Sequence, residues 1–122
     1  MDTKTLGKRG ETLACIFLIL KGYRIIKRNY RTKTSEIDII AKKGSTYIFA
    51  EVKTRSSHTF TKAVEAVDTF KQQRIIKGAM SFLSDSTEDV TLRFDIIEVY
   101  RNKDSLLRRY RINHIQNAFD AH

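Results

Sequence analysis

Apolar residues recur at helical spacing in two parts of the chain. They do so from Leu6 to Leu20, where Gly22 follows as a residue suited to a left-handed helix end. The same spacing appears from Ala63 to Leu83. An interruption near Asp68 divides this second pattern, and the Asp68 side chain can cap the main helical segment. We therefore predict two helices, the second followed by a polar loop at residues 84–89.

Between and after these helices, β-branched and aromatic residues concentrate in segments that are typical of strands. The predicted strands are Tyr23–Tyr30, Glu36–Lys43, Thr46–Thr54 and Thr91–Arg101, with a short fifth strand at Arg109–Ile115. Gly44 and Ser45 fit a two-residue type II′ turn, because Gly accepts the positive φ that the first turn position requires. Residues Ser56–Phe60 have no clear pattern and are expected to be irregular.

The predicted order is helix, three strands, helix, and one or two strands. Apolar residues on both faces of the second and third strands indicate central strands with a helix on each side. A chain of 122 residues has the size of one domain with one modest core. We therefore predict an α/β fold, a central mixed sheet flanked by helices, in a single domain that comprises residues 1–122.

The longest apolar run, Leu13–Leu20, is shorter than the roughly 20 residues that cross a bilayer, and no cleavage site for a secretory signal follows it. We read it as a buried helix and expect a cytoplasmic protein without a membrane segment. Cys15 lies inside this run and cannot form an internal disulfide, because it is the only cysteine. It is expected to be an inert core thiol.

The chain is strongly basic, with 23 Lys and Arg against 14 Asp and Glu and a formal net charge of +9. This balance favours a polyanionic partner such as nucleic acid, although single clusters of charge are also typical of solvated surfaces. The candidate nucleic-acid contacts are Lys8, Arg9, Arg28, Arg31, Lys33 and Arg55.

Two acids are predicted to meet across the hairpin of the second and third strands. With Gly44 and Ser45 as the turn, the antiparallel register places Asp38 directly opposite Glu51. Directly opposed residues have Cβ atoms about 4.5–5.5 Å apart, where two carboxylates repel each other. A divalent cation removes this repulsion, and carboxylate oxygens suit Mg²⁺ or Mn²⁺. The pair therefore predicts a metal site.

The same register places Glu36 opposite Lys53, on the face that carries both acids. Lys53 would hold a phosphate oxygen or orient the attacking water beside the metal. Glu36 is compatible with a ligand role, with support of a ligand, or with simple solvation near the start of its strand. The alternative for the whole group is a set of surface ion pairs, but apolar neighbours in both strands favour buried positions, where unpaired acids are costly.

Glu11 is a further acid, on the first predicted helix. Gly7, Gly10 and Ala14 form a stripe of small residues that would let this helix approach the sheet or a phosphate backbone closely. Glu11 would then extend over the site as an additional metal contact through water. The alternative is an ordinary acid near the helix start, which the helix dipole favours.

Other chemical groups carry less weight. The histidines have no spacing that would form a metal site: His58, His114 and His122. His58 is a candidate substrate contact after Arg55, with a solvated side chain as the simpler reading. Alternation places Asp95 and Glu98 on opposite faces of their strand, so we expect Asp95 to bond with Arg93 instead.

A series of short motifs runs through nearly the whole chain. In order they are GKRGE at 7–11, GY at 22–23, RNYR at 28–31, SEIDIIA at 35–41, FAEVKTR at 49–55, RFD at 93–95 and NAF at 117–119. The series resembles the YraN family of bacterial predicted endonucleases, which is similar to archaeal Holliday-junction resolvases of the PD-(D/E)XK nuclease superfamily. Ser35 departs from that pattern, because the family usually has Gly there.

The resemblance implies a restriction-endonuclease-like αβββαβ core. It implies Asp38 and Glu51 as metal ligands, Lys53 as the catalytic lysine and Glu11 as an additional acid at the site. The implied activity is Mg²⁺-dependent hydrolysis of phosphodiester bonds in DNA, with branched, Holliday-junction-like DNA as a candidate substrate and a homodimer as the candidate assembly.

Two other functions fit the same residues. One is a nucleic-acid-binding module that keeps a nuclease fold without turnover. The other is a nuclease that acts on RNA, because Lys and Arg bind the phosphates of DNA and RNA alike.

Overall fold

The computed structural model describes residues 3–56, 67–101 and 110–121. Within these ranges the elements follow the order αβββαββ: α1 (Thr3–Leu20), β1 (Arg24–Arg31), β2 (Glu36–Lys43), β3 (Thr46–Ser56), α3 (Thr69–Phe82), β4 (Thr91–Arg101) and β5 (Tyr110–Phe119). The predicted α/β class with a mixed sheet is confirmed. The segment expected to be irregular began at Ser56, but Ser56 is the last residue of β3, whose pairing with β4 extends to Arg101. The rest of that segment at 57–60, the helical pattern at 63–66, His58 and His122 lie outside the described residues.

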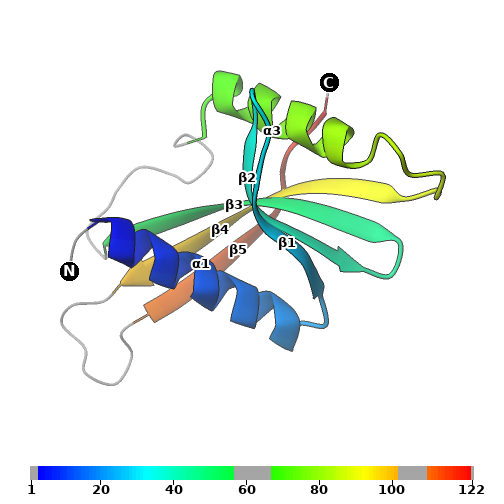
Figure 1. Cartoon of the computed structure of the whole chain (residues 1–122). Coiled ribbons are helices and arrows are strands. Elements are labelled where there is room, and N and C mark those ends of the chain that lie inside the picture. The colour runs from blue at the N-terminus through cyan, green and yellow to red at the C-terminus, as the bar shows by residue number, and fades with distance from the viewer. Residues whose placement is uncertain (1–2, 57–66, 102–109, 122) are drawn as a thin grey trace.

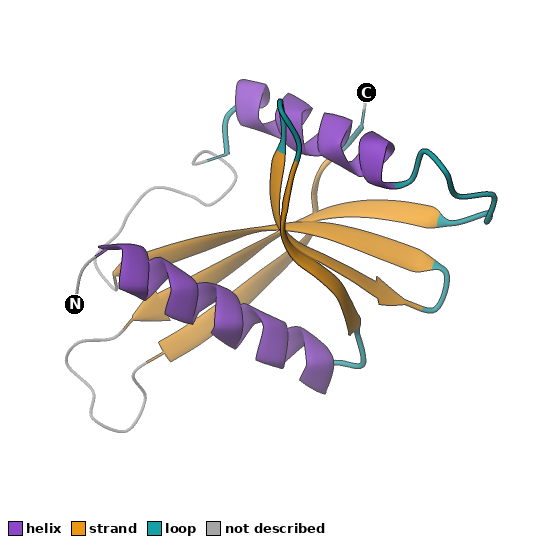
Figure 2. Ribbon diagram, viewed as in Figure 1, coloured by secondary structure: helices purple, strands orange, loops and turns teal. Residues whose placement is uncertain are grey.

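The five strands form one sheet in the order β1-β2-β3-β4-β5. Neighbouring strands are antiparallel except for the central pair, β3 and β4, which is parallel. A parallel pair requires a crossover connection, and α3 lies on that connection. Figures 1 and 2 show α1 across one face of the sheet and α3 across the other. The prediction of a helix on each face is confirmed.

Each helix contributes to its own apolar core. On the α1 face, Ala14, Cys15 and Leu18 pack with Ile48, Ala50 and Val99. On the α3 face, Ile75 and Ala79 pack with Phe49, Phe94 and Ile96. Strands β3 and β4 are therefore buried on both faces, which explains their nearly continuous apolar sequences. Cys15 is a buried free thiol, in agreement with the predicted core role.

The local signals in the sequence correspond to observed structure. Asp68 caps α3, and its Oδ1 accepts a hydrogen bond from the backbone N–H of Lys71 at 2.8 Å. Gly44 has φ of +60°, as the predicted turn requires. The β2–β3 register runs from Lys43–Thr46 to Ile39–Ala50, which is the register that this turn predicts.

Strand β5 extends to Phe119, four residues beyond the predicted end. The extension pairs with β4, a strand that is buried along most of its length. Asn117 has φ of 53° and donates its backbone N–H to Asp95 Oδ1 at 3.0 Å, where the β4–β5 register shifts. A long-range contact thus sets the end of this strand.

Helix α1 approaches β3 closely at one point. A Cβ atom on Gly10 would collide with the Oγ1 atom of Thr54, whereas a Cβ on Gly7 would meet no atom within 4 Å. The predicted close approach is therefore confirmed at Gly10 and does not involve Gly7. In the described part of the chain, neither helix is long and apolar enough to span a membrane.

Candidate active site

Strand β2 changes direction at Asp38. Its pairing with β3 ends at Ile39–Ala50, and on the other side Asn29 of β1, opposite Asp38, has φ of 51°. Ile37 packs in the α3 core although Ile39, two positions along, packs in the α1 core. Regular alternation would place both on one face. The kink therefore rotates the start of β2 toward α3 (Figure 1).

The Asp38 side chain occupies the gap that opens between β2 and β3. Its Oδ2 accepts a hydrogen bond from the backbone N–H of Val52 at 2.8 Å. A carboxylate thus satisfies an N–H group that no longer has a strand partner in β2. The ladder pair predicted for Asp38 with Glu51 does not form, because the strands have already diverged. The two carboxylates instead meet in a pocket.

This pocket has a volume of about 330 Å³ and is called the acid pocket below. It is lined by Glu36, Asp38, Glu51, Asp68, Phe70, Lys71 and Arg74. Glu36 and Asp38 come from the start of β2 and Glu51 from β3, whereas Asp68 and the other lining side chains come from the N-terminal end of α3. The predicted convergence of Asp38 and Glu51 is therefore present, with α3 as an additional wall.

Burial is the main reason that the pKa of Asp38 rises from 3.8 to about 7, and repulsion by Glu51 adds to the effect. The hydrogen bond from Val52 opposes this rise. Both carboxylates cannot ionise cheaply in one buried site. A proton on Asp38 removes the repulsion at neutral pH, and so would a cation bound between the two acids.

Glu51 is buried, with 4% of its surface exposed, and two lysines approach the same oxygen. Lys71 Nζ lies 2.5 Å from Oε1, and Lys53 Nζ lies 3.6 Å from it. Sequence reasoning identified Lys53 but missed Lys71. Lys71 follows the predicted cap Asp68 by three residues, but the sequence did not indicate that this turn of α3 packs above Glu51.

The two lysines differ in their protonation energetics. Burial lowers the pKa of Lys53, and the charge of Lys71 lowers it further. Burial also acts on Lys71, but its hydrogen bond to Glu51 outweighs that effect and raises the pKa. Lys71 is therefore the fixed counter-ion of Glu51, whereas Lys53 is the less strongly held cation.

Glu36 lies at the rim of the acid pocket and pairs with Arg31, whose Nη2 is 3.2 Å from Glu36 Oε1. Both side chains are exposed. The predicted cross-strand pairing of Glu36 with Lys53 is therefore wrong. The kink at Asp38 turns the start of β2 away from β3, so Glu36 reaches β1 and Lys53 turns to Glu51.

Glu11 of α1 is half-buried, and its Oε1 is buried without a hydrogen-bond partner among the described residues. Burial raises its pKa; the charge of Arg28 opposes this, and the charges of Glu36 and Glu51 reinforce it. Glu11 does not line the acid pocket. It nevertheless interacts electrostatically with the pocket acids and has a free acceptor atom, as a further acid at the site would need.

The acid pocket offers only a few candidate ligands to a divalent metal. In residues 3–56, 67–101 and 110–121, no group of three or more His, Cys, Asp or Glu side chains is placed to enclose a metal. The pocket does offer hard carboxylate oxygens from Asp38 and Glu51, which suit a hydrated Mg²⁺ or Mn²⁺ that needs few protein ligands. The residues present fit such an ion, provided that the ammonium group of Lys71 moves away from the Glu51 carboxylate.

Five of the six candidate nucleic-acid contacts are exposed: Lys8, Arg9, Arg28, Arg31 and Lys33. Arg55 differs. Its side chain is 6% exposed, and its Nε lies 3.5 Å from Glu98 Oε2, which also accepts a hydrogen bond from the Tyr100 hydroxyl. This arrangement holds the Arg55 guanidinium within the protein rather than at an exposed phosphate-binding position.

Asp95 has a structural role on the α1 face. Arg93 donates to both of its oxygens at 2.9 Å, which confirms the expected bond. His114 Nε2 lies 2.7 Å from Oδ2, a partner that sequence reasoning missed. Burial alone would raise the pKa of Asp95, but the hydrogen bonds from His114 and Arg93 prevail and lower it. Asp95 is therefore an ionised core residue.

The fold and the acid pocket together define a small α/β protein in which two carboxylates and two lysines gather where neighbouring strands diverge. The chain belongs to the uncharacterised protein family UPF0102, whose model matches residues 10–99. YraN is a name for this family, so membership of the family that the motifs indicated is confirmed, and the relation to nucleases stays a prediction. The matched range contains every residue of the acid pocket and Glu11.

Relatives in several bacteria match almost the entire chain. A UPF0102 protein of Caldanaerobacter subterraneus subsp. tengcongensis is 44% identical over 120 residues, which cover 98% of both chains. One from Alkaliphilus oremlandii is 45% identical over 119 residues, or 95% of this chain and 98% of the relative. One from Christiangramia forsetii is 44% identical over 114 residues, or 93% and 92% of the two chains.

Proposed function

We propose that this chain is a metal-dependent endonuclease of the cytoplasm that hydrolyses phosphodiester bonds in DNA, with branched DNA as a candidate substrate. The observation that carries the proposal is the buried pairing of Asp38 with Glu51 beside Lys53 and Lys71. Such a pairing of acids destabilises the fold unless a charge compensates it. Buried groups of charged residues that destabilise the fold in this way are typical of functional sites.

Asp38 and Glu51 would hold Mg²⁺ or Mn²⁺, with Glu11 as a nearby acid. The bound ion would supply a water of lowered pKa and would neutralise charge on the phosphate. Asp38 would release the proton that its raised pKa retains at neutral pH. Lys53 Nζ would donate to a phosphate oxygen and stabilise the charge that develops there. Its proximity to Glu51 keeps the ammonium group at the site.

The basic surface would bind the polyanionic substrate. The net charge of +9 and the exposed cations on α1 and β1 favour association with a phosphate backbone. Lys71 has a further role in the free protein, because it neutralises Glu51 until a divalent cation competes for the same oxygen. The ion pair of Lys71 with Glu51 would keep the pocket stable when neither metal nor substrate is bound.

The proposal is tested by cleavage of labelled linear, flapped and four-way DNA, and of RNA, in Mg²⁺ or Mn²⁺. We expect DNA cleavage that Asp38→Asn abolishes and that Lys53→Met slows about 10²-fold, the usual effect of removing one donor that stabilises developing charge. Asp85→Asn, in the exposed loop after α3, is the matched control and should cleave normally. Cleavage that survives both site changes contradicts the proposal, and cleavage confined to RNA changes the substrate class.

A nucleic-acid-binding module without turnover is the second candidate. The observation in its favour is that Lys71 already neutralises Glu51. This candidate predicts DNA binding that weakens steeply with salt, in the absence of any metal-dependent cleavage.

A further inference from the structure

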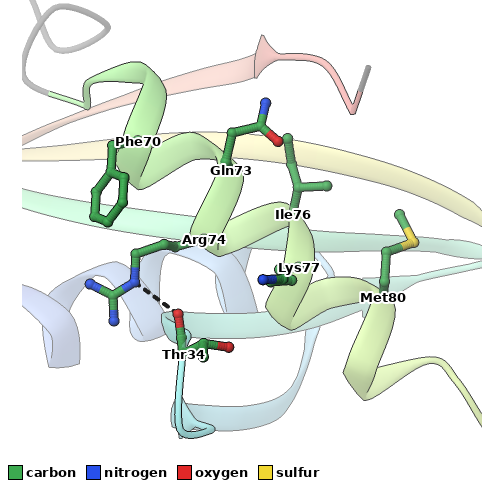
Figure 3. Close-up of a pocket in the computed structure, with 7 residues that line it drawn as sticks. All are labelled: Thr34, Phe70, Gln73, Arg74, Ile76, Lys77 and Met80. Carbon is green, nitrogen blue, oxygen red and sulfur yellow. Dashed lines mark hydrogen bonds between the residues drawn. The ribbon is translucent and has the colours of Figure 1, made fainter.

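A second cavity, of about 660 Å³, adjoins the acid pocket and lies along α3 beside Thr34 of the β1–β2 loop (Figure 3). The two share Phe70 and Arg74 as lining residues. Farther along α3 the cavity is lined by Ile76, Lys77 and Met80 (Figure 3). The name Phe70–Arg74 groove is used below for this cavity. It combines apolar surface with cationic groups and leads directly to the acids.

Phe70 is 73% exposed, an unusual position for a large aromatic side chain in the first turn of a helix. The guanidinium carbon of Arg74 lies 5.9 Å from the centre of its ring. Arg74 is itself held in place, because its Nε donates to the backbone carbonyl of Thr34 at 2.8 Å (Figure 3). The hairpin between β1 and β2 thus positions the cation beside the exposed ring.

The terminal nitrogens of Arg74 have no hydrogen-bond partner among the described residues. Within that part of the chain they are open to a phosphate oxygen, and the exposed ring of Phe70 offers an apolar face. Aromatic rings beside arginines are a common platform for unpaired bases, because every base has a π-face that can stack. The groove therefore presents both groups that a nucleotide requires, a stacking surface and a phosphate donor.

We propose that the Phe70–Arg74 groove binds an unpaired nucleobase of the DNA strand whose phosphate enters the acid pocket. This inference rests on the proposed function and narrows its substrate class to strands with an unpaired base beside the cleaved bond. A base inside a duplex must first leave its stack, which costs free energy that an already unpaired base does not require. The groove therefore selects single strands and branch points over continuous duplex.

Charge decides between a nucleic acid and a second copy of the chain as the occupant. Arg74 and Lys77 line the groove, and the chain as a whole carries a formal charge of +9. A second copy would bring a like net charge to this surface, whereas a DNA strand brings phosphates that neutralise it.

The experiment uses DNA with 2-aminopurine, a fluorescent base whose emission falls when it stacks, and a chelator to prevent cleavage. We expect quenching when the probe is in a single strand or at a flap junction, and none when it is inside a duplex. Phe70→Leu should remove the quenching and weaken single-strand binding roughly tenfold, the effect of losing one stacked base. Phe70→Trp should retain both.

Leu20→Ala is the control, because Leu20 is 82% exposed on the opposite helix and should change neither signal. Unchanged quenching in Phe70→Leu would overturn the proposal. So would a wild-type dimer that this change converts to a monomer in sedimentation, since the groove would then join two copies. Thermal melting verifies that Phe70→Leu folds, as expected for an exposed position.

Cleavage assays separate this inference from the proposed function. Quenching that depends on Phe70, without cleavage under any metal condition, would contradict the proposed nuclease activity and support the base-binding groove. Cleavage with the same ratio of single-strand to duplex rates in wild type and Phe70→Leu would contradict base binding in the groove and support the nuclease activity.

Discussion

Asp38 accepts a hydrogen bond from the backbone N–H of Val52 at 2.8 Å, at the position where β2 and β3 stop pairing. The Asp38 carboxylate thus replaces a backbone carbonyl of β2 as the acceptor for this N–H group. Because this bond holds the carboxylate in the pocket that Glu51 also lines, the local break in the sheet and the acid pocket have the same origin.

Asp38→Asn should stabilise the metal-free protein at alkaline pH. The folded-state pKa of about 7 lies above the ordinary value of 3.8, so ionised Asp38 destabilises the fold above pH 7. An Asn oxygen can still accept from Val52. We expect a gain on the order of 2 kcal/mol at pH 8, allowing for partial solvent exposure of the group.

This gain should shrink as the pH falls from 7 toward 4, because Asp38 is then protonated in the folded state and the cost disappears. Urea unfolding in EDTA at several pH values measures it. A constant difference between wild type and variant across this range would contradict the assigned electrostatics.

Lys71→Met should strengthen the binding of Mn²⁺ in the absence of DNA. Lys71 Nζ occupies Glu51 Oε1, and its removal leaves the pocket more negative. We expect an affinity increase on the order of tenfold, since one unit charge within a few ångströms has an effect of this size or larger. Calorimetric titration measures the affinity.

Lys77→Met is the matched control for this titration, because Lys77 lies on the same helix but does not line the acid pocket. It should leave the Mn²⁺ affinity unchanged. Equal affinities for wild type and Lys71→Met would mean that Lys71 and the metal do not compete.

Gly10→Ala should lower the free energy of unfolding by about 1–2 kcal/mol, because its new Cβ collides with Thr54 Oγ1 and forces the helix away from β3. Gly7→Ala meets no atom and should raise the free energy of unfolding by about 0.5–1 kcal/mol, the difference in helix propensity. Thermal or urea unfolding compares the two.

The double variant Gly10→Ala with Thr54→Ala completes a mutant cycle with the single changes. It should recover most of the loss, since the colliding oxygen is gone. Additive losses would show that Gly10 acts through something other than this contact.

Asp95→Asn should destabilise the fold by about 3–5 kcal/mol at neutral pH, because Arg93 and His114 lose a buried ionised partner. The pKa of Asp95 is below 3.8 in the folded state, so its contribution is present at higher pH and is lost as the pH falls through that lower value. Urea unfolding at pH 7 and at about pH 3 should show a smaller difference at the lower pH. A difference that grows with acid would contradict this sign.

Short-range patterns in the sequence predicted much of the observed fold. The Asp68 cap, the Gly44 turn and the hairpin register from Lys43–Thr46 to Ile39–Ala50 all depend on neighbouring residues, and all are present. The apolar character of β3 and β4 also follows from burial on two faces. These features are encoded locally, because backbone conformation and strand alternation act over a few residues.

The tertiary structure decided how the site is completed. The kink at Asp38 depends on the simultaneous packing of Ile37 under α3 and Ile39 under α1, and it separates Glu36 from Lys53. No local sequence pattern indicates that two residues of one strand pack in different cores.

The sequence by itself determined that Asp38, Glu51 and Lys53 would lie on neighbouring strands of one hairpin, since a two-residue turn fixes which strands pair and their register up to Ile39–Ala50. Only the tertiary structure brought Lys71 and Arg74 over it and moved Arg55 to Glu98. For Arg55 the physical reason is the long-range pairing of β3 with β4. For the two residues of α3 it is that a helix can pack on a sheet in several rotations and positions. The summed burial of both cores selects one of them, and with it the side chains that reach the acids.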